Sequence, residues 1–401
     1  MNWTSLRCLL FVPLGLALQG FALVSGATVW RPNQDSEVIA TVRTGGWSAA
    51  DRELRNLRQT LAANPTQPSL ALEVAQRALD RGKREADPRL LGQAELALAP
   101  WKDQSDVPVP LRLVRANLYQ TLHNFPAALA DLNQVLKEDP RHLQAWLLKA
   151  TVHTVQGDYT QARMAAAQLL GKADDLVATA AIAQIGIVTG SAEAACRQLE
   201  RALEEELARA ESLPADSSRT AVRVWSTTML AEALAGLGRS VPAEQRFREA
   251  LSLDPKDPYL LAAVADFLLS QNRPEEVLTL LAAHRSQDGL RLRWAEASYR
   301  ATGELPTHEV AVLAEQFAAA RVRGERVHLR EEARFELRLR GQPTRALALA
   351  RENWRVQKET ADFQLLWEAA QAVPDEPTLR ELKEWPAQSG FVPRLPGQPQ
   401  L

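Results

Sequence analysis

Small residues recur along this chain at fixed distances. In three places an alanine precedes a glycine by seven residues and a second alanine follows the glycine by five: Ala150, Gly157 and Ala162; Ala183, Gly190 and Ala195; Ala231, Gly238 and Ala243. Similar residues also recur 34 positions apart, as Ala116 and Ala150 do. A fixed period of this length is typical of an array of like modules.

Small residues at fixed spacings suit helices that pack closely against one another. A methyl-sized side chain at a helix crossing lets the two backbones approach, and bulkier residues fill the space between pairs. A glycine between the helices supplies the left-handed residue that ends the first one. One helical pair cannot bury enough apolar surface to be stable alone, so we expect each unit to stack on its neighbours and to contact only them.

Two consecutive units carry the pattern most clearly. The first begins near residue 109 and has Ala116, Phe125, Ala128, Leu132, Val135 and Pro140 at its positions 8, 17, 20, 24, 27 and 32. The second has Trp146, Ala150, Gly157, Tyr159 and Ala162 at positions 4, 8, 15, 17 and 20. This pattern resembles the tetratricopeptide repeat family, although Lys149 stands where leucine is usual. The resemblance implies an all-α, right-handed superhelical solenoid of antiparallel helix pairs that binds other macromolecules.

The units divide the chain into six segments. We expect a signal peptide over residues 1–27, an extended arm over 28–47 and degenerate helical repeats over 48–104. The main array covers 105–285, with a long helix and a loop inserted around 203–219, and diverged helices with a C-terminal cap cover 286–385. The proline-rich residues 386–401 are expected to form a flexible tail.

The N-terminus has the composition of a secretory signal. Arg7 precedes an apolar stretch from Cys8 to Val24, and Ser25 and Ala27 occupy the two small positions before a cleavage site. This predicts export, with the bacterial periplasm as the compartment. An uncleaved membrane anchor is the alternative, but Pro13 interrupts a stretch that barely reaches the length of a spanning helix.

Charge and cysteine content narrow the range of partners. The chain is 46% hydrophobic and 24% charged with a formal net charge of -2, which argues against nucleic acid as a partner. Removal of the signal leaves Cys196 as the one cysteine, so no internal disulfide can form. We interpret Cys196 as a small buried residue and expect partners to be proteins or peptides of the cell envelope.

The resemblance also implies which residues line the inner groove of such an array. They come from the first helix of each unit, and Trp225 and Tyr259 are the expected aromatic anchors for a bound peptide. The full set is Leu113, Asn117, Gln120, Leu147, Thr151, Thr154, Gln184, Trp225, Thr228, Glu232, Tyr259 and Asp266.

A second candidate site is a stripe of arginines spaced by four along one expected helix: Arg326, Arg330, Arg334 and Arg338. Such a stripe could hold carboxylates or phosphates, which would suit an anionic polymer or polysaccharide of the envelope. The alternative that we favour is neutralisation in ordinary ion pairs by Glu325, Glu331, Glu332 and Glu336.

Catalytic motifs are weak in this sequence. His328 with Glu331 and Glu332 could share a metal on a helix, but the second histidine of zinc-protease motifs is missing. The sequence contains no glycine-rich phosphate loop, nucleophile elbow or paired-cysteine metal site. We therefore expect a scaffold or adaptor without catalytic activity, cofactor or metal; a metal-dependent hydrolase at His328 is the weakest alternative.

Overall fold

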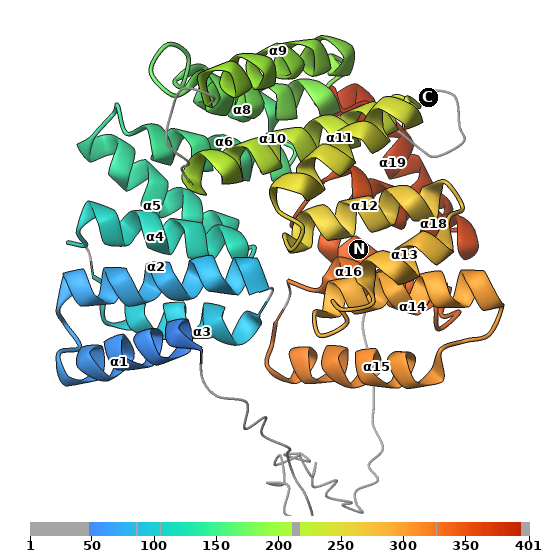
Figure 1. Ribbon diagram of the computed structural model, residues 1–401, viewed down its shortest axis with the longest axis horizontal. Helices are drawn as coiled ribbons and strands as arrows, with labels where there is room; N and C mark the ends of the chain where they lie inside the picture. The colour runs from blue at the N-terminus through green and yellow to red at the C-terminus, as the bar shows by residue number, and fades with distance from the viewer. Residues whose placement is uncertain (1–47, 86, 105, 211–216, 326, 394–401) are drawn as a thin grey trace, which may run out of the picture. The chain divides into compact units, whose positions relative to one another are not determined.

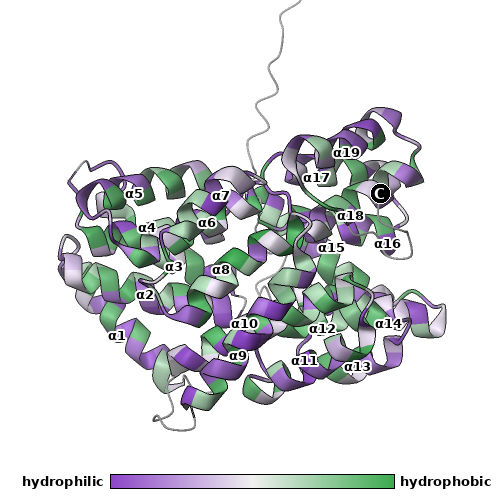
Figure 2. Cartoon of the chain, turned by 90° about the horizontal axis from the view of Figure 1, so that it is seen from above, coloured by the Kyte–Doolittle hydropathy of each residue, from purple (hydrophilic) through white to green (hydrophobic). Residues whose placement is uncertain are grey.

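The computed structural model describes residues 48–85, 87–104, 106–210, 217–325 and 327–393. The expected signal peptide and arm, Arg326 and the last eight residues lie outside these ranges. Within them, nineteen α-helices and one short 3-10 helix form a succession of antiparallel pairs (Figure 1). Figure 2 shows hydrophilic and hydrophobic residues alternating along most of the helices, as expected where one face of each helix is buried.

The first half of the chain contains α1 Ala49–Ala63, α2 Pro68–Glu85, α3 Pro88–Leu98, η1 Ala99–Trp101, α4 Val109–Thr121, α5 Phe125–Glu138, α6 Leu143–Val155, α7 Tyr159–Ala167, α8 Asp175–Val188 and α9 Ala192–Ala210. The second half contains α10 Ser217–Gly236, α11 Ser240–Leu253, α12 Pro258–Ser270, α13 Pro274–Leu281, α14 Asp288–Thr302, α15 Thr307–Val322, α16 Leu329–Arg338, α17 Pro343–Trp354, α18 Thr360–Ala372 and α19 Glu376–Ser389.

The turns inside successive pairs share one hydrogen-bond pattern. In the successive pairs from α4–α5 to α12–α13, a backbone N–H reaches the carbonyl five residues earlier, from Asn124 to Tyr119, Asp158 to His153, Ser191 to Gly186, Arg239 to Leu234 and Arg273 to Leu268. The residue before each donor has a positive φ, as predicted for Gly157 at 76°. His123 and Asn272 adopt the same conformation at φ 57°, so this turn forms in the array without glycine as well.

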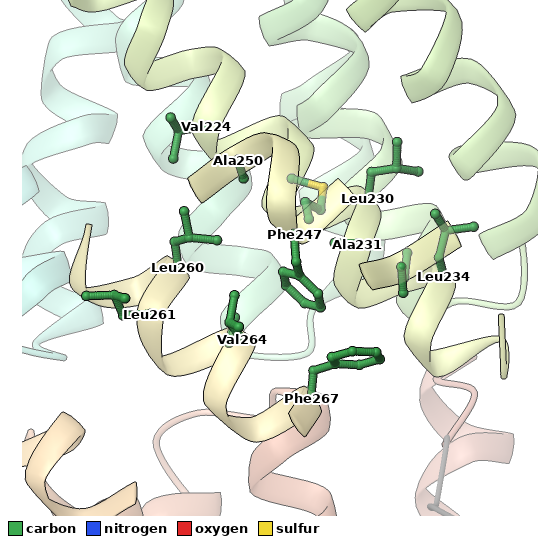
Figure 3. Close-up of a cluster of buried hydrophobic side chains, with 14 of the residues drawn as sticks. Val224, Leu230, Ala231, Leu234, Phe247, Ala250, Leu260, Leu261, Val264 and Phe267 are labelled. Atoms are coloured by element: carbon green, nitrogen blue, oxygen red, sulfur yellow. The ribbon is translucent and has the colours of Figure 1, made fainter. Parts of the chain in front are cut away.

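The alanines at the crossings are buried as expected. Ala150 and Ala162 are 2% and 0% exposed, and the corresponding alanines of the neighbouring pairs are 0% to 3% exposed. Figure 3 shows one of the resulting cores, in which Phe247 of α11 and Phe267 of α12 lie near Leu230 and Ala231 of α10. The two phenylalanine ring centres are 5.3 Å apart.

The insertion lengthens two helices. The second helix of the pair α8–α9 has 19 residues. The following helix, α10, has 20 residues and begins at Ser217, fourteen residues before Ala231, whereas α6 begins seven residues before the equivalent Ala150. The extra residues therefore extend both helices toward the segment 211–216, which lies outside the described residues.

The expectation that units contact only their neighbours is wrong at the C-terminus. Side chains of α17 to α19 share a buried cluster with residues of α6 to α8, including Ala162, Ile185, Trp354 and Phe363. The N–H of Lys358 donates to the carbonyl of Val155 at 2.7 Å, and that of Val392 donates to the carbonyl of Val188 at 2.8 Å. These carbonyls are at the ends of α6 and α8, where no later residue of the helix can bond to them.

The predicted flexible tail is also wrong between residues 386 and 393. The helix α19 continues through Trp385 and Pro386 to Ser389, and Phe391 is 1% exposed. The rings of Trp354 and Trp385 meet edge to face with centres 5.8 Å apart, and Phe391 packs against Phe363 at 5.3 Å. Burial of these aromatic side chains outweighs the helix-breaking tendency of the nearby prolines.

Candidate interaction surface

The predicted groove residues come from α4, α6, α8, α10 and α12, the first helices of five successive pairs. The structure brings two of them together across neighbouring repeats. The hydroxyl of Tyr259, at the start of α12, donates a hydrogen bond to Oε2 of Glu232 on α10 at 2.8 Å. Tyr259 remains 59% exposed, which leaves a large aromatic surface open to solvent.

The carboxylate of Glu232 is in an unusual electrostatic environment. Its side chain is exposed, yet surrounding protein atoms displace enough water to raise its pKa to about 7. The like charges of Glu359 and Asp266 act in the same direction, and the hydrogen bond from Tyr259 opposes them. No lysine or arginine among the described residues lies within ion-pair distance of Glu232, so this carboxylate keeps an unused capacity for a cationic or hydrogen-bonding group.

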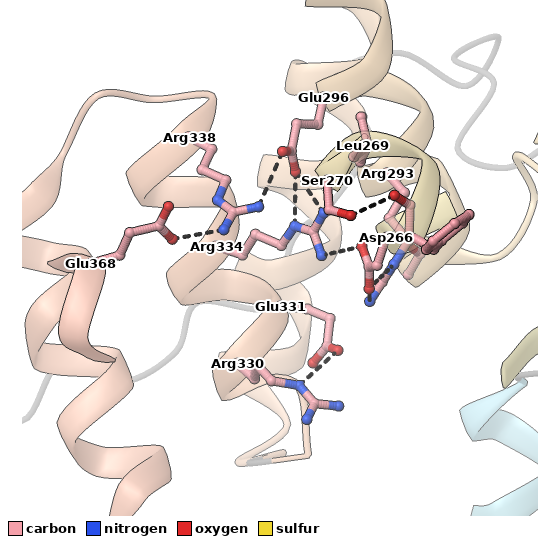
Figure 4. A network of polar contacts seen from close by, with 12 residues as sticks. Asp266, Leu269, Ser270, Arg293, Glu296, Arg330, Glu331, Arg334, Arg338 and Glu368 are labelled. Atoms are coloured by element: carbon pink, nitrogen blue, oxygen red, sulfur yellow. Dashed lines mark hydrogen bonds and ion pairs between the residues drawn. The ribbon is translucent and has the colours of Figure 1, made fainter. Parts of the chain in front are cut away.

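Asp266 is part of an ion-pair network between α12, α14 and α16 (Figure 4). Its oxygens accept from Arg293 at 2.7 Å and from Arg334 at 2.7 Å. Burial would raise the pKa of Asp266, but these two guanidinium groups outweigh it and hold the pKa below its usual range. Asp266 is therefore held by its own chain and is a poor contact for a partner.

Glu296 of α14 is the buried centre of the same network. It is 1% exposed, and its carboxylate contacts Arg300, Arg334 and Arg338. Burial raises the pKa of Glu296, but the three guanidinium groups together lower it to about 2. Glu296 thus stays ionised and fixes the arginines of α16 in place.

Arg330 is the first arginine of the stripe within the described residues. Its guanidinium is 2.8 Å from Glu359, 3.4 Å from Asp362 and 3.5 Å from Glu331. Asp362 is 2% exposed, and burial raises its pKa to about 6 despite the nearby positive charge of Arg330. Amide groups of Asn353 and Gln357 also donate to Asp362, at 2.8 and 3.2 Å.

The favoured interpretation of the stripe, neutralisation by ion pairs, agrees with these contacts, but most of the expected partners were wrong. Glu331 does contact Arg330 at 3.5 Å, whereas the other main partners, Asp266, Glu296, Glu359, Asp362 and Glu368, come from α12, α14 and the region of α18. The expected glutamates instead pair elsewhere: Glu325 with Arg323, Glu332 with Arg321 and Arg345, and Glu336 with Arg345. An anion could reach Arg330, Arg334 or Arg338 only by replacing these carboxylates.

Three predicted groove residues are buried. Leu113, Thr154 and Thr228 are 8%, 7% and 1% exposed. The hydroxyl of Thr154 donates to the carbonyl of Ala150, and that of Thr228 donates to the carbonyl of Val224. Packing by neighbouring helices therefore removes these three side chains from any surface that a partner could contact.

The remaining predicted residues are only partly accessible. Gln120, Leu147 and Gln184 are half-buried, and Thr151 uses its hydroxyl on the carbonyl of Leu147. The carbonyl oxygen of the Asn117 side chain accepts from Lys83 Nζ at 2.7 Å. Trp225, the other expected anchor, is half-buried and packs against the core around α10. The most accessible part of the predicted surface is therefore the pair Tyr259 and Glu232.

Sequence reasoning missed the acidic partners of the arginines. Arg334 and Asp266 are 68 residues apart, and Arg338 and Glu296 are 42 apart, so no local spacing connects them. The four-residue spacing of the arginines did indicate one shared helix face. In the structure, that face contacts α12 and α14, the first helices of earlier pairs. Acidic residues of first helices were therefore the partners to consider.

Within the part of the chain that the structure describes, His328 belongs to no metal-binding group. The described residues contain no group of three histidine, cysteine or acidic side chains arranged to hold a metal. Within the same residues, no helix combines the length and apolar composition that crossing a bilayer requires.

Comparison with known proteins agrees with the repeat pattern. A family model described as "Tetratricopeptide repeat" matches residues 113–176, which form most of the pairs α4–α5 and α6–α7. No curated protein sequence matches this chain.

Several solved structures are similar at low identity. A tetratricopeptide repeat protein from Parabacteroides merdae ATCC 43184 is 17% identical, with a TM-score of 0.40, over 65% of this chain and 90% of that one. The APC/C hetero-tetramer Cut9-Hcn1 is 15% identical, with a TM-score of 0.32, over 80% and 67%. The structure of Naa15/Naa10 bound to HypK-THB is 15% identical, with a TM-score of 0.23, over 85% and 60%.

The family match covers two helix pairs. The same turn and crossing geometry recurs in later pairs. The left-handed turn with its hydrogen bond over five residues recurs in the pairs α8–α9, α10–α11 and α12–α13. Buried alanines recur at the crossings of α8 with α9 and of α10 with α11. Residues 113–176 therefore match the tetratricopeptide repeat family, and the described residues form an all-α solenoid of antiparallel helix pairs.

Proposed function

We propose that this chain is a non-catalytic scaffold that binds a partner protein at the surface around Tyr259 and Glu232. The observation that carries the proposal is the 59% exposure of Tyr259 beside a carboxylate that lacks an ion-pair partner among the described residues. An exposed aromatic ring with a polar handle is a frequent source of binding energy at protein interfaces. The repeat architecture supports this general role.

Site-specific photocrosslinking tests the location of the surface. A photoreactive phenylalanine analogue at Tyr259 should capture a discrete partner in the native cell, whereas the same analogue at Val241 should not. Val241 is a suitable control because it is 81% exposed on α11, the second helix of its pair. Capture of the same protein from both positions, or from neither, would contradict the proposed surface.

Purified partner then gives a quantitative test. Tyr259→Ala removes the ring and should weaken binding by at least about tenfold if the ring is a main contact. Tyr299→Ala is the matched control, because Tyr299 is 40% exposed on α14 and its loss should leave the affinity within about twofold. Equal effects of the two variants would show that the ring of Tyr259 is not a specific contact.

We further propose that the protein is exported and that its partner belongs to the cell envelope. The support is the apolar stretch from Cys8 to Val24 with small residues before Thr28. N-terminal sequencing of the protein from its native cells should find Thr28 as the first residue. Retention of Met1 in a membrane fraction would instead indicate an uncleaved anchor.

A further inference from the structure

A pocket lies between α6 and α7, and none of its lining residues is one of the predicted groove residues. Its volume is about 330 Å³. Met164 at the pocket is 59% exposed, so much of its flexible apolar side chain is open to solvent. The lining residues are Trp146, Lys149, Gln161, Met164, Ala165, Ala167 and Gln168.

Lys149 is a positive charge in this pocket without a carboxylate beside it. Its Nζ donates to the side-chain oxygen of Asn133 at 2.7 Å and lies 5.4 Å from the centre of the Trp146 ring. No aspartate or glutamate among the described residues is within ion-pair distance of this ammonium group. Burial lowers the pKa of Lys149, because the charge has lost part of its water without gaining a counter-charge.

The preceding repeat contains a carboxylate at the position where Lys149 lacks one. Arg115 is 34 residues before Lys149 and is paired in a fork with Asp131, at 2.7 Å for Nε to Oδ2 and 2.6 Å for Nη2 to Oδ1. The residue 34 positions after Asp131 is Ala165, whose methyl group lines the pocket. The second repeat therefore keeps the cation of the first and has lost the carboxylate that would pair with it.

We propose that this pocket binds an apolar side chain of a partner protein that carries a carboxylate directly beside it. Trp146, Met164 and the alanines of α7 form the apolar wall for the side chain. The carboxylate binds Lys149 and supplies the charge that Asp131 supplies to Arg115 in the preceding repeat. Charge complementarity thus selects an acidic partner segment over a neutral one.

Methyl NMR tests this proposal on the full-length protein. The sequence has three methionines, of which Met164 is in the pocket and Met229 is 8% exposed in a different core cluster. With ¹³C-methyl methionine, N-acetyl-leucyl-aspartate amide at millimolar concentration should shift the Met164 signal and leave that of Met229 unchanged. The same peptide with asparagine in place of aspartate should bind about fivefold more weakly, which is the upper end of what a partly exposed ion pair contributes.

Two variants test whether the charge of Lys149 distinguishes the aspartate peptide from the asparagine peptide. Lys149→Met keeps the length of the side chain and removes its charge, so the two peptides should bind with equal affinity. Ala165→Asp restores the carboxylate found in the preceding repeat and should abolish the shift of Met164; if this variant does not fold, Lys149→Met alone decides. The proposal is overturned if neither peptide shifts Met164 in the unmodified protein, or if both do so with the same affinity.

Discussion

The hydroxyl of Tyr259 donates a hydrogen bond at 2.8 Å to Glu232, 27 residues earlier and one repeat away. This contact lowers the pKa of Glu232, while displacement of water by the surrounding protein atoms and the charges of Glu359 and Asp266 raise it to a net value of about 7. A carboxyl group whose pKa is raised in the folded state favours folding when it is protonated. Its contribution therefore declines as the pH rises from about 4.5 to about 7 and is constant above that.

Tyr259→Phe should raise the pKa of Glu232 further, because the variant removes a hydrogen bond to the charged form. The measurement is a ¹³C NMR titration of the glutamate side-chain carboxyl signals, with Glu232→Gln used to assign the resonance. The unmodified protein should show a midpoint near 7 for Glu232. An ordinary midpoint, or a lower one after Tyr259→Phe, would show that the ring does not stabilise the charged carboxylate.

Ala162→Leu should lower the free energy of unfolding by about 1 to 3 kcal/mol, because Ala162 is 0% exposed at the crossing of α6 and α7 and a larger side chain overpacks it. Chemical denaturation measures the effect. Ala208→Leu is the matched control, since Ala208 is exposed on α9, and its effect should stay within about 0.5 kcal/mol. Similar stabilities for the two variants would contradict the assigned crossing.

The repeat register could be predicted from the sequence because few residue types are small enough to stand where two helices cross closely. Ala150, Ala162, Gly157 and their equivalents are small for a geometric reason, and that reason recurs at each pair. The resemblance to the repeat family, and not this packing argument, placed Tyr259 and Glu232 in one groove of adjacent repeats. It could not show that Thr154 and Thr228 are buried, because the degree of coverage depends on the exact packing of neighbouring helices.

The ion pairs and the C-terminal contact could not be predicted in this way. The chain has 47 basic lysines and arginines and 49 acidic residues, so charge alone does not select Asp266 as the partner of Arg334. The contacts of Lys358 with Val155 and of Val392 with Val188 use backbone groups that every repeat offers. The sequence features that indicated a packed C-terminal segment were Trp385 and Phe391, since large aromatic side chains seldom remain exposed in a tail.

Arg334→Met should destabilise the protein by about 3 kcal/mol, because it leaves the buried carboxylate of Glu296 with fewer cationic partners and leaves Asp266 with Arg293 alone. Arg323→Met is the control: Arg323 is an exposed residue that pairs with Glu325, and its loss should cost about 0 to 1 kcal/mol. Denaturant titrations of both variants beside the unmodified protein measure the difference.

The effect of Arg334→Met should also depend on pH. The pKa of Glu296 is lowered to about 2, so its ionic contribution is present above about 4.5 and is lost as the pH falls toward 2. The stability difference between the variant and the unmodified protein should therefore shrink over this range. A difference that stays constant down to pH 2 would mean that the loss comes from packing of the arginine stem and not from its charge.

Gly157→Ala and Gly238→Ala form a matched pair that measures the C-terminal contact. Both glycines end the first helix of a pair with a positive φ, 76° and 74°, so both variants share the cost of about 1 to 2 kcal/mol for a left-handed alanine. A Cβ atom at Gly157 would lie 2.8 Å from the ring of Trp385, whereas nothing lies within 4 Å of one at Gly238. Gly157→Ala should therefore be the more destabilising variant, by about 1 kcal/mol or more in denaturant titrations.

Trp385→Ala tests whether the ring of Trp385 causes the greater destabilisation by Gly157→Ala. In a background that lacks the Trp385 ring, the two glycine variants should have nearly equal effects, because the obstructing atoms are gone; a double-mutant cycle then gives the coupling between Gly157 and Trp385. An excess at Gly157 that persists without the ring would place its cause inside the α6–α7 pair. Its disappearance would show that α19 packs against this turn in solution, so that the C-terminal helices stabilise the middle of the array as well as its end.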